Sequence, residues 1–337
     1  MDALTTLRTE INRLGFTPNE QDSLRKYFTE NVEKINVVVS FLPDYATDDE
    51  KRGYLKSLIS TPAGTSKSPN GLVFVFVDNS NLFIEGKYTV GNLEKAGTID
   101  RKRGSFYFNE LRFDHGCLLS TVMNGRRIGS DPVIVGSRPP PNDSLWKHIK
   151  SQGFKVVLYD RNVENKEKKI DTSLVVDGMK VITSKDPGVF VLIAGDGDYY
   201  PMVLEALYLN WKVEVWFWTS GISGDLLPKE EKSRLSFYPL DDCYRYFAYA
   251  SGPNFEKKYV LEITDGITIK KWGDEQIMDC FVSLELFGWW NWEDETVVHL
   301  YFDDKLYFEK AKKWMEDKYS DIQVWEAKRS KSRRQSH

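Results

Sequence analysis

The chain has 337 residues, of which 41% are hydrophobic and 14% aromatic, so it can bury a sizeable core and is expected to hold about two or three domains. Its formal charge of -4 and its pI near 5.8 provide no overall positive field. A nucleic-acid partner would therefore have to be met by local basic patches.

The cysteines and the apolar runs exclude several further classes. Three cysteines are too few for a disulfide framework and too far apart for a zinc knuckle, so we expect ordinary buried thiols. The longest purely apolar run, Leu72 to Val77, is far shorter than the roughly 18 residues that a membrane span needs. Charges near the N-terminus occupy the place of a signal peptide's apolar core. We expect an intracellular protein, cytoplasmic or nuclear, with no membrane partner.

Residues 1–60 are predicted to form a helical N-terminal region, because Leu4, Leu7, Ile11 and Leu14 recur at helical spacing. Residues 61–71 (TPAGTSKSPNG) are rich in Pro, Gly, Ser and Thr and contain no large apolar side chain. That composition is typical of a flexible linker, and we place a domain boundary there.

From Leu72 onward the pattern becomes that of an α/β domain, which we assign to residues 72–250. The run LVFVFV is typical of a strand buried on both faces, as in a parallel sheet covered by helices. Further strands alternate with helices, the strands near 132–136, 155–159, 188–194 and 212–218 and the helices near 143–152, 172–184 and 199–210. This alternation predicts a Rossmann-like parallel sheet sandwiched by helices, with its ligand at the carboxyl ends of the strands.

A glycine-rich and basic stretch, residues 85–128, interrupts this alternation. It is interpreted either as a solvated insertion or as a loop that grips a substrate beside the site.

Residues 253–327 are predicted to form a C-terminal α+β domain whose strand and helix order, βαββαβ, is ferredoxin-like and is shared by RRM-like RNA-binding modules. Rings of His299, Tyr301 and Trp325 are candidates to face RNA, and the alternative is a structural or dimerising domain. The basic tail, residues 328–337, either contacts phosphate or is simply solvated. These flanking regions are also our candidates for contact with a second copy of the chain or another protein.

Carboxylates stand where this topology would gather them at one rim of the sheet. Asp78 ends the first strand, Asp171 is expected to open a helix, and Asp196 and Asp198 follow the strand VFVLIA. Crowded carboxylates raise one another's pKa, so such a cluster is kept mainly where a cation resides. Oxygen ligands without histidine or thiolate favour Mg²⁺ or Mn²⁺. Any one of these aspartates alone is more often a helix cap or a turn residue.

A cation held this way can lower the pKa of a bound water and neutralise charge on a phosphate, which is the chemistry of phosphodiester hydrolysis. No side chain in the sequence stands out as a dedicated general base. A metal-bound hydroxide attacking in line is therefore the mechanism that we expect.

Three segments carry a family resemblance: FVFVDNSNLF, KKIDTSLVVDGM and VFVLIAGDGDYYPMVLEAL. Together and in this order they resemble the NYN domain of the PIN-like nuclease superfamily, the group that includes LabA-type proteins and meiosis-arrest RNA-regulating nucleases. The resemblance covers about residues 72–240. It implies a ribonuclease in which Asp78, Asp171, Asp196 and Asp198 hold the metal and carry out catalysis.

The resemblance and the positions of polar residues near the predicted site also suggest which side chains contact the substrate. They are Asn79, Asn81, Arg138, Lys168, Lys169, Thr172 and Tyr199. The alternatives are that Asn81 fixes the first turn, that Thr172 and Tyr199 cap helices, and that the two lysines lie in a solvated loop. We expect endonucleolytic action on RNA, more readily on single strands. The alternative is a non-catalytic RNA-binding or scaffold protein that uses the domain as a platform.

Other acid-dependent or nucleotide-binding folds fit the sequence less well. A HAD-type hydrolase needs a second aspartate two residues after its nucleophile, where this chain has Ser80, and a TOPRIM-like fold has glutamate rather than Asp78 after its first strand. The segment GDGDYY is no dinucleotide fingerprint, because Tyr200 takes the place of the third glycine.

Overall fold

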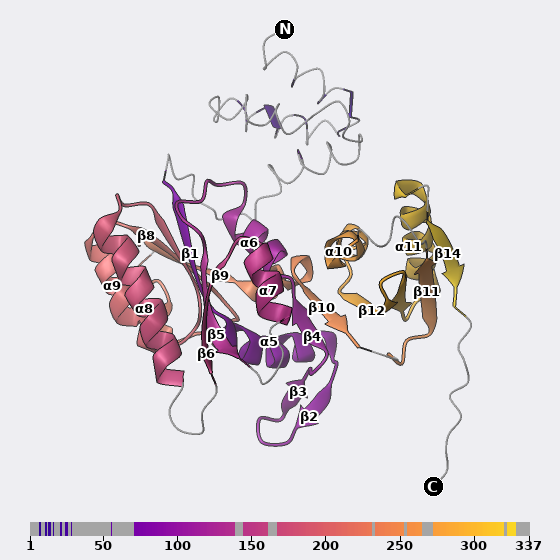
Figure 1. Ribbon diagram of the computed structural model, residues 1–337, viewed down its shortest axis with the longest axis horizontal. Coiled ribbons are helices and arrows are strands. Elements are labelled where there is room, and N and C mark those ends of the chain that lie inside the picture. The colour runs from indigo at the N-terminus through magenta and orange to yellow at the C-terminus, as the bar shows by residue number, and fades with distance from the viewer. Residues whose placement is uncertain are drawn as a thin grey trace. The chain divides into compact units, whose positions relative to one another are not determined.

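The computed structural model describes residues 71–138, 144–160, 167–230, 233–252, 255–264, 272–319 and 322–327, with isolated positions between 7 and 55. Of residues 138, 160 and 167–171 only the backbone is described. The chain forms two compact units, Met1–Asn70 with Asn124–Arg126, and Gly71–Met123 with Arg127–His337 (Figure 1).

The described positions of the first unit agree with the predicted helical region. Leu7, Ile11, Leu24, Phe28 and Leu55 are helical and buried, which is the outcome expected for apolar residues at helical spacing. The predicted linker, except for Gly71, and the basic tail lie outside the described residues.

A six-stranded parallel sheet forms the centre of the second unit, as the alternating pattern predicted. Its order is β6-β5-β1-β7-β8-β9, and each neighbouring pair is parallel. The strands are β1 (Val73–Asp78), β5 (Val133–Arg138), β6 (Lys155–Asp160), β7 (Val189–Ile193), β8 (Lys212–Phe217) and β9 (Leu235–Pro239). The chain runs outward from β1 to β6 and then crosses to β7 on the other side of β1. The order therefore reverses between β1 and β7, where open α/β sheets usually bind ligands.

Helices cover both faces of this sheet (Figure 1). Val73, Val75 and Val77 of β1 join the core formed with three of the helices, whereas Phe74 and Phe76 join the core formed with the other two. The first three are α5 (Asn79–Glu94), α6 (His115–Met123) and α7 (Ser144–Ser151), and the other two are α8 (Glu167–Ser184) and α9 (Tyr200–Tyr208). Because successive side chains of a strand point to opposite faces and both faces are covered, β1 is apolar at every position from Val73 to Val77.

Residues 85–128 are not the solvated insertion that was one of their two interpretations. Helix α5 already takes up its first residues, and an antiparallel hairpin follows, formed by β2 (Thr98–Asp100) and β3 (Ser105–Tyr107). Beyond the hairpin, Phe108 and Leu111 are buried. The apolar side chains of FYFNELRF draw this part of the chain into the core, so only the hairpin remains a projecting element.

A second sheet has the order β14-β11-β13-β12-β10-β4. Its strands are β4 (Leu111–Phe113), β10 (Ala248–Ser251), β11 (Tyr259–Thr264), β12 (Gly288–Asp294), β13 (Val297–Phe302) and β14 (Gln323–Glu326). Helices α10 (Asp274–Ser283) and α11 (Lys305–Lys318) share its core. Strands β11 to β14 pair antiparallel in the sheet order β14-β11-β13-β12, which confirms the predicted βαββαβ arrangement. However, β10 and β4 extend this sheet across the boundary expected near residue 250.

The three rings predicted to face RNA lie on the second sheet, and carboxylates lie close to one of them. His299 lies 3.1 Å from Glu262 and 3.7 Å from Glu293. Tyr301 is only 7% exposed and packs edge-on against Phe255. Trp325 is 56% exposed. The carboxylates of Glu262 and Glu293 would repel a phosphate at His299, and RNA binding by this face stays a prediction.

Short 3₁₀ helices complete the described elements: η2 (Gly197–Tyr199), η3 (Gly224–Leu226), η4 (Leu240–Asp242) and η5 (Tyr244–Tyr246). The three cysteines are free thiols. Within the described residues, no helix combines the length and the apolar character needed to cross a membrane.

Asp274, the first residue of α10, anchors that helix to the second sheet. Its carboxylate accepts hydrogen bonds from the indole Nε1 atoms of Trp290 and Trp292, each at 2.9 Å, and from the Tyr249 hydroxyl. The negative charge also suits the start of a helix.

We predict that Asp274→Ala lowers the free energy of unfolding by about 3 kcal/mol, because it leaves three partly buried donors without their charged acceptor. Urea denaturation of the full chain measures this change. Asp317→Ala, at an exposed position of α11, serves as the control and should shift stability by less than about 0.5 kcal/mol. Equal effects of the two variants would contradict the anchoring role.

Candidate functional site

Asp78 lies where β1 ends and α5 begins, and its carboxylate is only 4% exposed. It caps the helix by accepting a hydrogen bond from the backbone N–H of Asn81 at 3.0 Å. Its other oxygen accepts a hydrogen bond from the Tyr199 hydroxyl at 2.8 Å. The carboxylate is thus held from two sides, by its own helix and by the segment after β7.

The two asparagines among the expected substrate contacts, Asn79 and Asn81, also make hydrogen bonds that link elements of the site. The side-chain oxygen of Asn81 accepts a hydrogen bond from the backbone N–H of Gly195 at 2.8 Å. This bond links the first turn of α5 to the loop that follows β7. The side-chain oxygen of Asn79 lies 2.8 Å from Nε2 of His115, the first residue of α6.

Tyr199 is not available for the substrate contact that was expected of it, because its side chain is fully buried. Its hydroxyl points to Asp78 instead. The sequence segment GDGDYYP indicated an aromatic residue beside the acids but not the direction of its side chain. His115 had no sequence signal at all; burial lowers the pKa of its imidazole to about 4, so the ring is neutral at physiological pH.

Asp196 and Asp198 follow β7 and are both exposed. Asp196 caps η2, its carboxylate accepting a hydrogen bond from the backbone N–H of Asp198 at 3.0 Å. The loop can approach the sheet here because Gly195 has no side chain: a Cβ at that position would lie 2.1 Å from the ring of Phe217. The structure therefore brings Asp196 to the carboxyl end of β7, beside β1.

Asp171 does not open a helix as expected. Helix α8 begins at Glu167, because the residues before Asp171 are good helix formers. The N-terminus of this helix, with its partial positive charge, was expected at residue 172 and therefore lies more than one turn earlier. The side chains of Asp171, Lys168 and Lys169, and that of Arg138 at the end of β5, lie outside the described residues.

Thr172, the last of the expected contacts, is exposed on α8.

The electrostatics of the described acids are unfavourable in the absence of a cation. Burial raises the pKa of Asp78 above its ordinary value of 3.8, against the lowering effect of its hydrogen bonds from Asn81 and Tyr199. The charge of Asp196 raises that pKa further. A bound cation would reverse both penalties.

The carboxylates described at this rim, Asp78 and Asp196, offer oxygen ligands, which suit a hard divalent cation. Within the side chains described, no three His, Cys, Asp or Glu residues are grouped closely enough to hold a metal ion. Asp78 and Asp196 are the described carboxylates that interact here, since the charge of Asp196 raises the pKa of Asp78.

An open hollow of about 480 Å³ lies beside Asp196. Its walls come from α5, from the loop after β7, from the loop after β8 and from the β2–β3 hairpin. They comprise Asn81, Glu85, Arg103, Gly195, Asp196, Gly197, Ser220, Gly221, Ile222 and Ser223.

Comparison with known proteins identifies the part of the chain that carries this site. Residues 72–232 match the family model of the NYN domain. This range falls within the segment whose motifs resembled that family. No curated protein and no solved structure matches the chain.

We predict that Asp78→Asn raises the free energy of unfolding at pH 7 in metal-free buffer, because it removes a carboxylate whose ionisation the fold disfavours. The folded-state pKa of Asp78 is raised, so its penalty is absent below the unfolded value of 3.8 and grows as the pH rises through the folded value. Denaturant unfolding of the two proteins between pH 3.5 and pH 7 measures the difference. A stability gain that is the same at both ends of this range would contradict the ionisation argument.

Proposed function

Because residues 72–232 form an NYN domain of the PIN-like nuclease superfamily, we propose that this chain is a metal-dependent ribonuclease that cuts RNA endonucleolytically. The observation that carries the proposal is the position of Asp78 and Asp196 at the ends of neighbouring strands, where the strand order of the sheet reverses. Asp171 and Asp198 complete the proposed acidic set. In open α/β sheets this is the place where ligands bind.

Mg²⁺ or Mn²⁺ is the proposed cofactor, held by the carboxylates of Asp78, Asp171, Asp196 and Asp198. Oxygen-only donors and the unfavourable charge of Asp78 beside Asp196 support this choice. When bound, such a cation supplies Lewis acidity towards a phosphate oxygen and lowers the pKa of a coordinated water.

The chain's own residues orient these carboxylates. Tyr199 donates a hydrogen bond to one oxygen of Asp78 and so favours its ionised form, while Asn81 fixes the loop that carries Asp196. Each carboxylate oxygen accepts more than one interaction, so the bonds to Asn81 and Tyr199 leave Asp78 able to bind a cation as well.

An endonuclease needs a site that an RNA strand can cross without being threaded from one end. The hollow beside Asp196 is open, and both Asp196 and Asp198 are exposed. A single strand can bend its phosphates towards such a site more readily than a duplex, which supports single-stranded RNA as the proposed substrate.

We expect the purified full chain to cleave an internally labelled single-stranded RNA with Mg²⁺ or Mn²⁺ and to be inactive in EDTA. Asp196→Asn with Asp198→Asn should reduce the rate at least about a hundredfold, because the carboxylates that hold the charge-stabilising cation are lost. Asp186→Asn, an exposed aspartate after α8, is the matched control and should retain full activity.

Two results would count against the nuclease. Cleavage that survives EDTA or the double substitution would come from another source. RNA binding without turnover on several RNAs would instead favour the platform function, in which the domain holds RNA and does not cut it.

Tyr199→Phe tests the orientation of Asp78. The hydrogen bond from Tyr199 lowers the pKa of Asp78, so its removal should raise that pKa and move the acidic limb of the rate profile to higher pH. We also expect kcat to fall about tenfold at pH 7, as for residues that orient metal ligands. Tyr200→Phe is the matched control, and a profile like that of wild type would contradict the role of Tyr199.

A further inference from the structure

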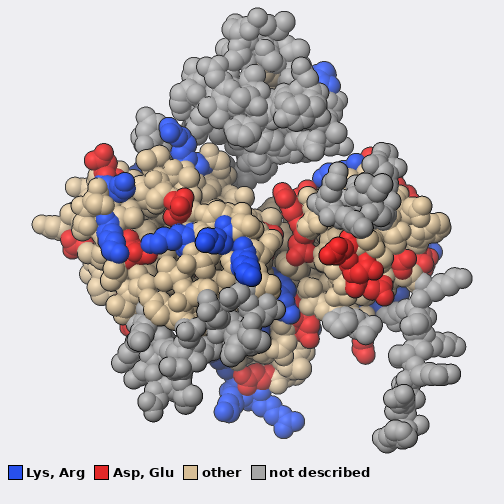
Figure 2. Space-filling model, viewed as in Figure 1, with Lys and Arg blue, Asp and Glu red and all other residues tan. Residues whose placement is uncertain are grey.

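The β2–β3 hairpin presents three consecutive cations at its turn, Arg101, Lys102 and Arg103, all exposed. The Asp100 carboxylate accepts a hydrogen bond from the backbone N–H of Lys102 at 2.8 Å, and Gly104 closes the turn with a φ of 64°. Figure 2 shows the Lys and Arg side chains gathered at this tip. On an acidic chain, the hairpin is thus a local basic patch of the kind that a nucleic-acid partner requires.

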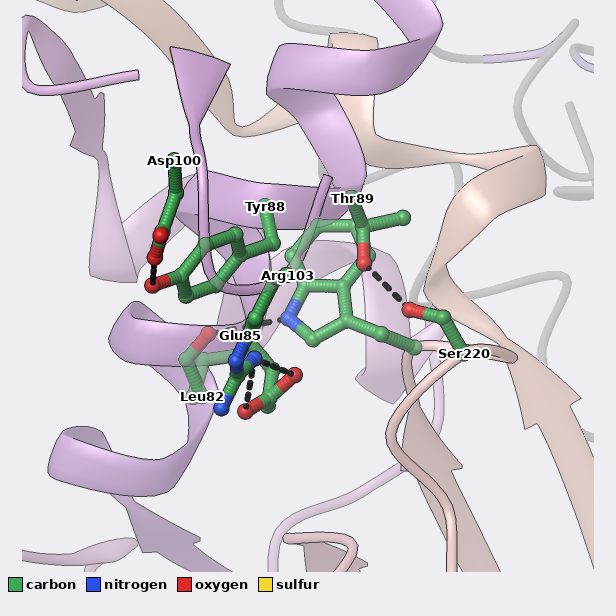
Figure 3. A network of polar contacts seen from close by, with 8 residues as sticks. Leu82, Glu85, Tyr88, Thr89, Asp100, Arg103 and Ser220 are labelled. Atoms are coloured by element: carbon green, nitrogen blue, oxygen red, sulfur yellow. Dashed lines mark hydrogen bonds and ion pairs between the residues drawn. The ribbon is translucent and has the colours of Figure 1, made fainter. Parts of the chain in front are cut away.

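Arg103 is held in a defined orientation by side chains of α5 (Figure 3). Its Nη1 donates to both carboxylate oxygens of Glu85, at 3.2 and 3.3 Å. Its guanidinium carbon lies 4.1 Å above the ring of Tyr88, whose hydroxyl donates to Asp100 at 2.8 Å. The guanidinium plane is therefore fixed by a stacked ring, and Nη2 and Nε have no hydrogen-bond partner in the described part of the chain.

Glu85 and Arg103 line the same hollow as Asp196. Arg103 is the one cation among the residues described at this hollow, and the hydroxyls of Ser220 and Ser223 also line it. The Ser220 hydroxyl lies 2.8 Å from that of Thr89 on α5 (Figure 3). The hollow thus combines donors for an anion with the proposed catalytic acid Asp196.

A phosphate can replace Glu85 as the partner of Arg103. The Arg103 side chain is 49% exposed, and water screens such a surface pair so that it contributes little to stability. A phosphodiester offers oxygens that match the planar fork of a guanidinium and can bind it through two parallel hydrogen bonds. A phosphate entering the hollow would therefore compete well with Glu85 for Arg103.

We propose that the β2–β3 hairpin is a phosphate-binding arm, in which Arg103 contacts an RNA backbone phosphate next to the one held at Asp196. Arg101 and Lys102 meet the phosphates that follow along the strand. The contact is with the backbone and is independent of base sequence. This inference rests on the proposed function for its substrate, but it concerns binding, which can be measured without cleavage.

The test is fluorescence anisotropy of the full chain with a labelled single-stranded oligouridine in EDTA, titrated at several salt concentrations. Arg103→Gln should weaken binding about three- to tenfold and reduce the slope of log affinity against log salt by about 0.7, the value for one lost phosphate contact on a single strand. Lys313→Gln, an exposed cation of α11, is the matched control and should leave both quantities unchanged.

Glu85→Gln distinguishes a phosphate-binding role of Arg103 from a purely structural role of the Glu85–Arg103 ion pair. If Glu85 and Arg103 only stabilised the hairpin, both substitutions would weaken RNA binding alike. The proposal expects Glu85→Gln to bind RNA as tightly as wild type or more tightly, because Arg103 loses its competing partner. Thermal unfolding of each variant verifies that it is folded.

The possible results distinguish this inference from the nuclease itself. Normal binding and salt dependence in Arg103→Gln would overturn the arm even if wild type cuts RNA. If Arg103→Gln weakens RNA binding but wild type never cleaves RNA, the phosphate-binding arm is supported and the proposed nuclease activity is contradicted. The absence of any RNA binding by wild type would also overturn the arm.

Discussion

A buried carboxylate at the middle of the parallel sheet is the constraint on which the site depends. Asp78 ends the strand that lies at the centre of both cores, and its hydrogen bond from Tyr199 reaches across to the segment after β7. A second hydrogen bond, from the backbone N–H of Gly195 to the side-chain oxygen of Asn81, joins the same two segments. These two links lie beside the ladder that joins β1 to β7, at the point where the strand order of the sheet reverses. They also fix a negative charge where the protein solvates it poorly, and this unfavourable charge is what a cation would relieve.

The features that follow from local pattern were predictable. A strand of a parallel sheet buried on both faces is apolar along its buried length, so LVFVFV identified β1. An aspartate at the end of β1 and another in the loop after β7 had to meet at one rim. The βαββαβ order of the C-terminal region likewise followed from the alternation of strands and helices.

What the sequence did not predict depends on contacts between distant segments. The side chain of Tyr199 turns inward because its partner, Asp78, is 121 residues away in the chain. Strand β4 has three residues and pairs with β10, which follows it by more than a hundred positions. No periodicity within a short window records such pairings. The start of α8 at Glu167 was missed for a local reason, because strong helix formers continued the helix past the residue taken as its cap.

The pairing of β4 with β10 has a consequence for any fragment of this protein. Phe113 packs against Phe247, and Phe108 lies 6.1 Å from Phe287, measured between ring centroids. A piece cut at the limits of the family match, residues 72–232, would lose β9 and leave these aromatic side chains facing water. It would also expose an unpaired strand edge, the feature through which chains stick to one another. A fragment that keeps these strands and aromatic contacts covered must therefore extend beyond the matched range, residues 72–232.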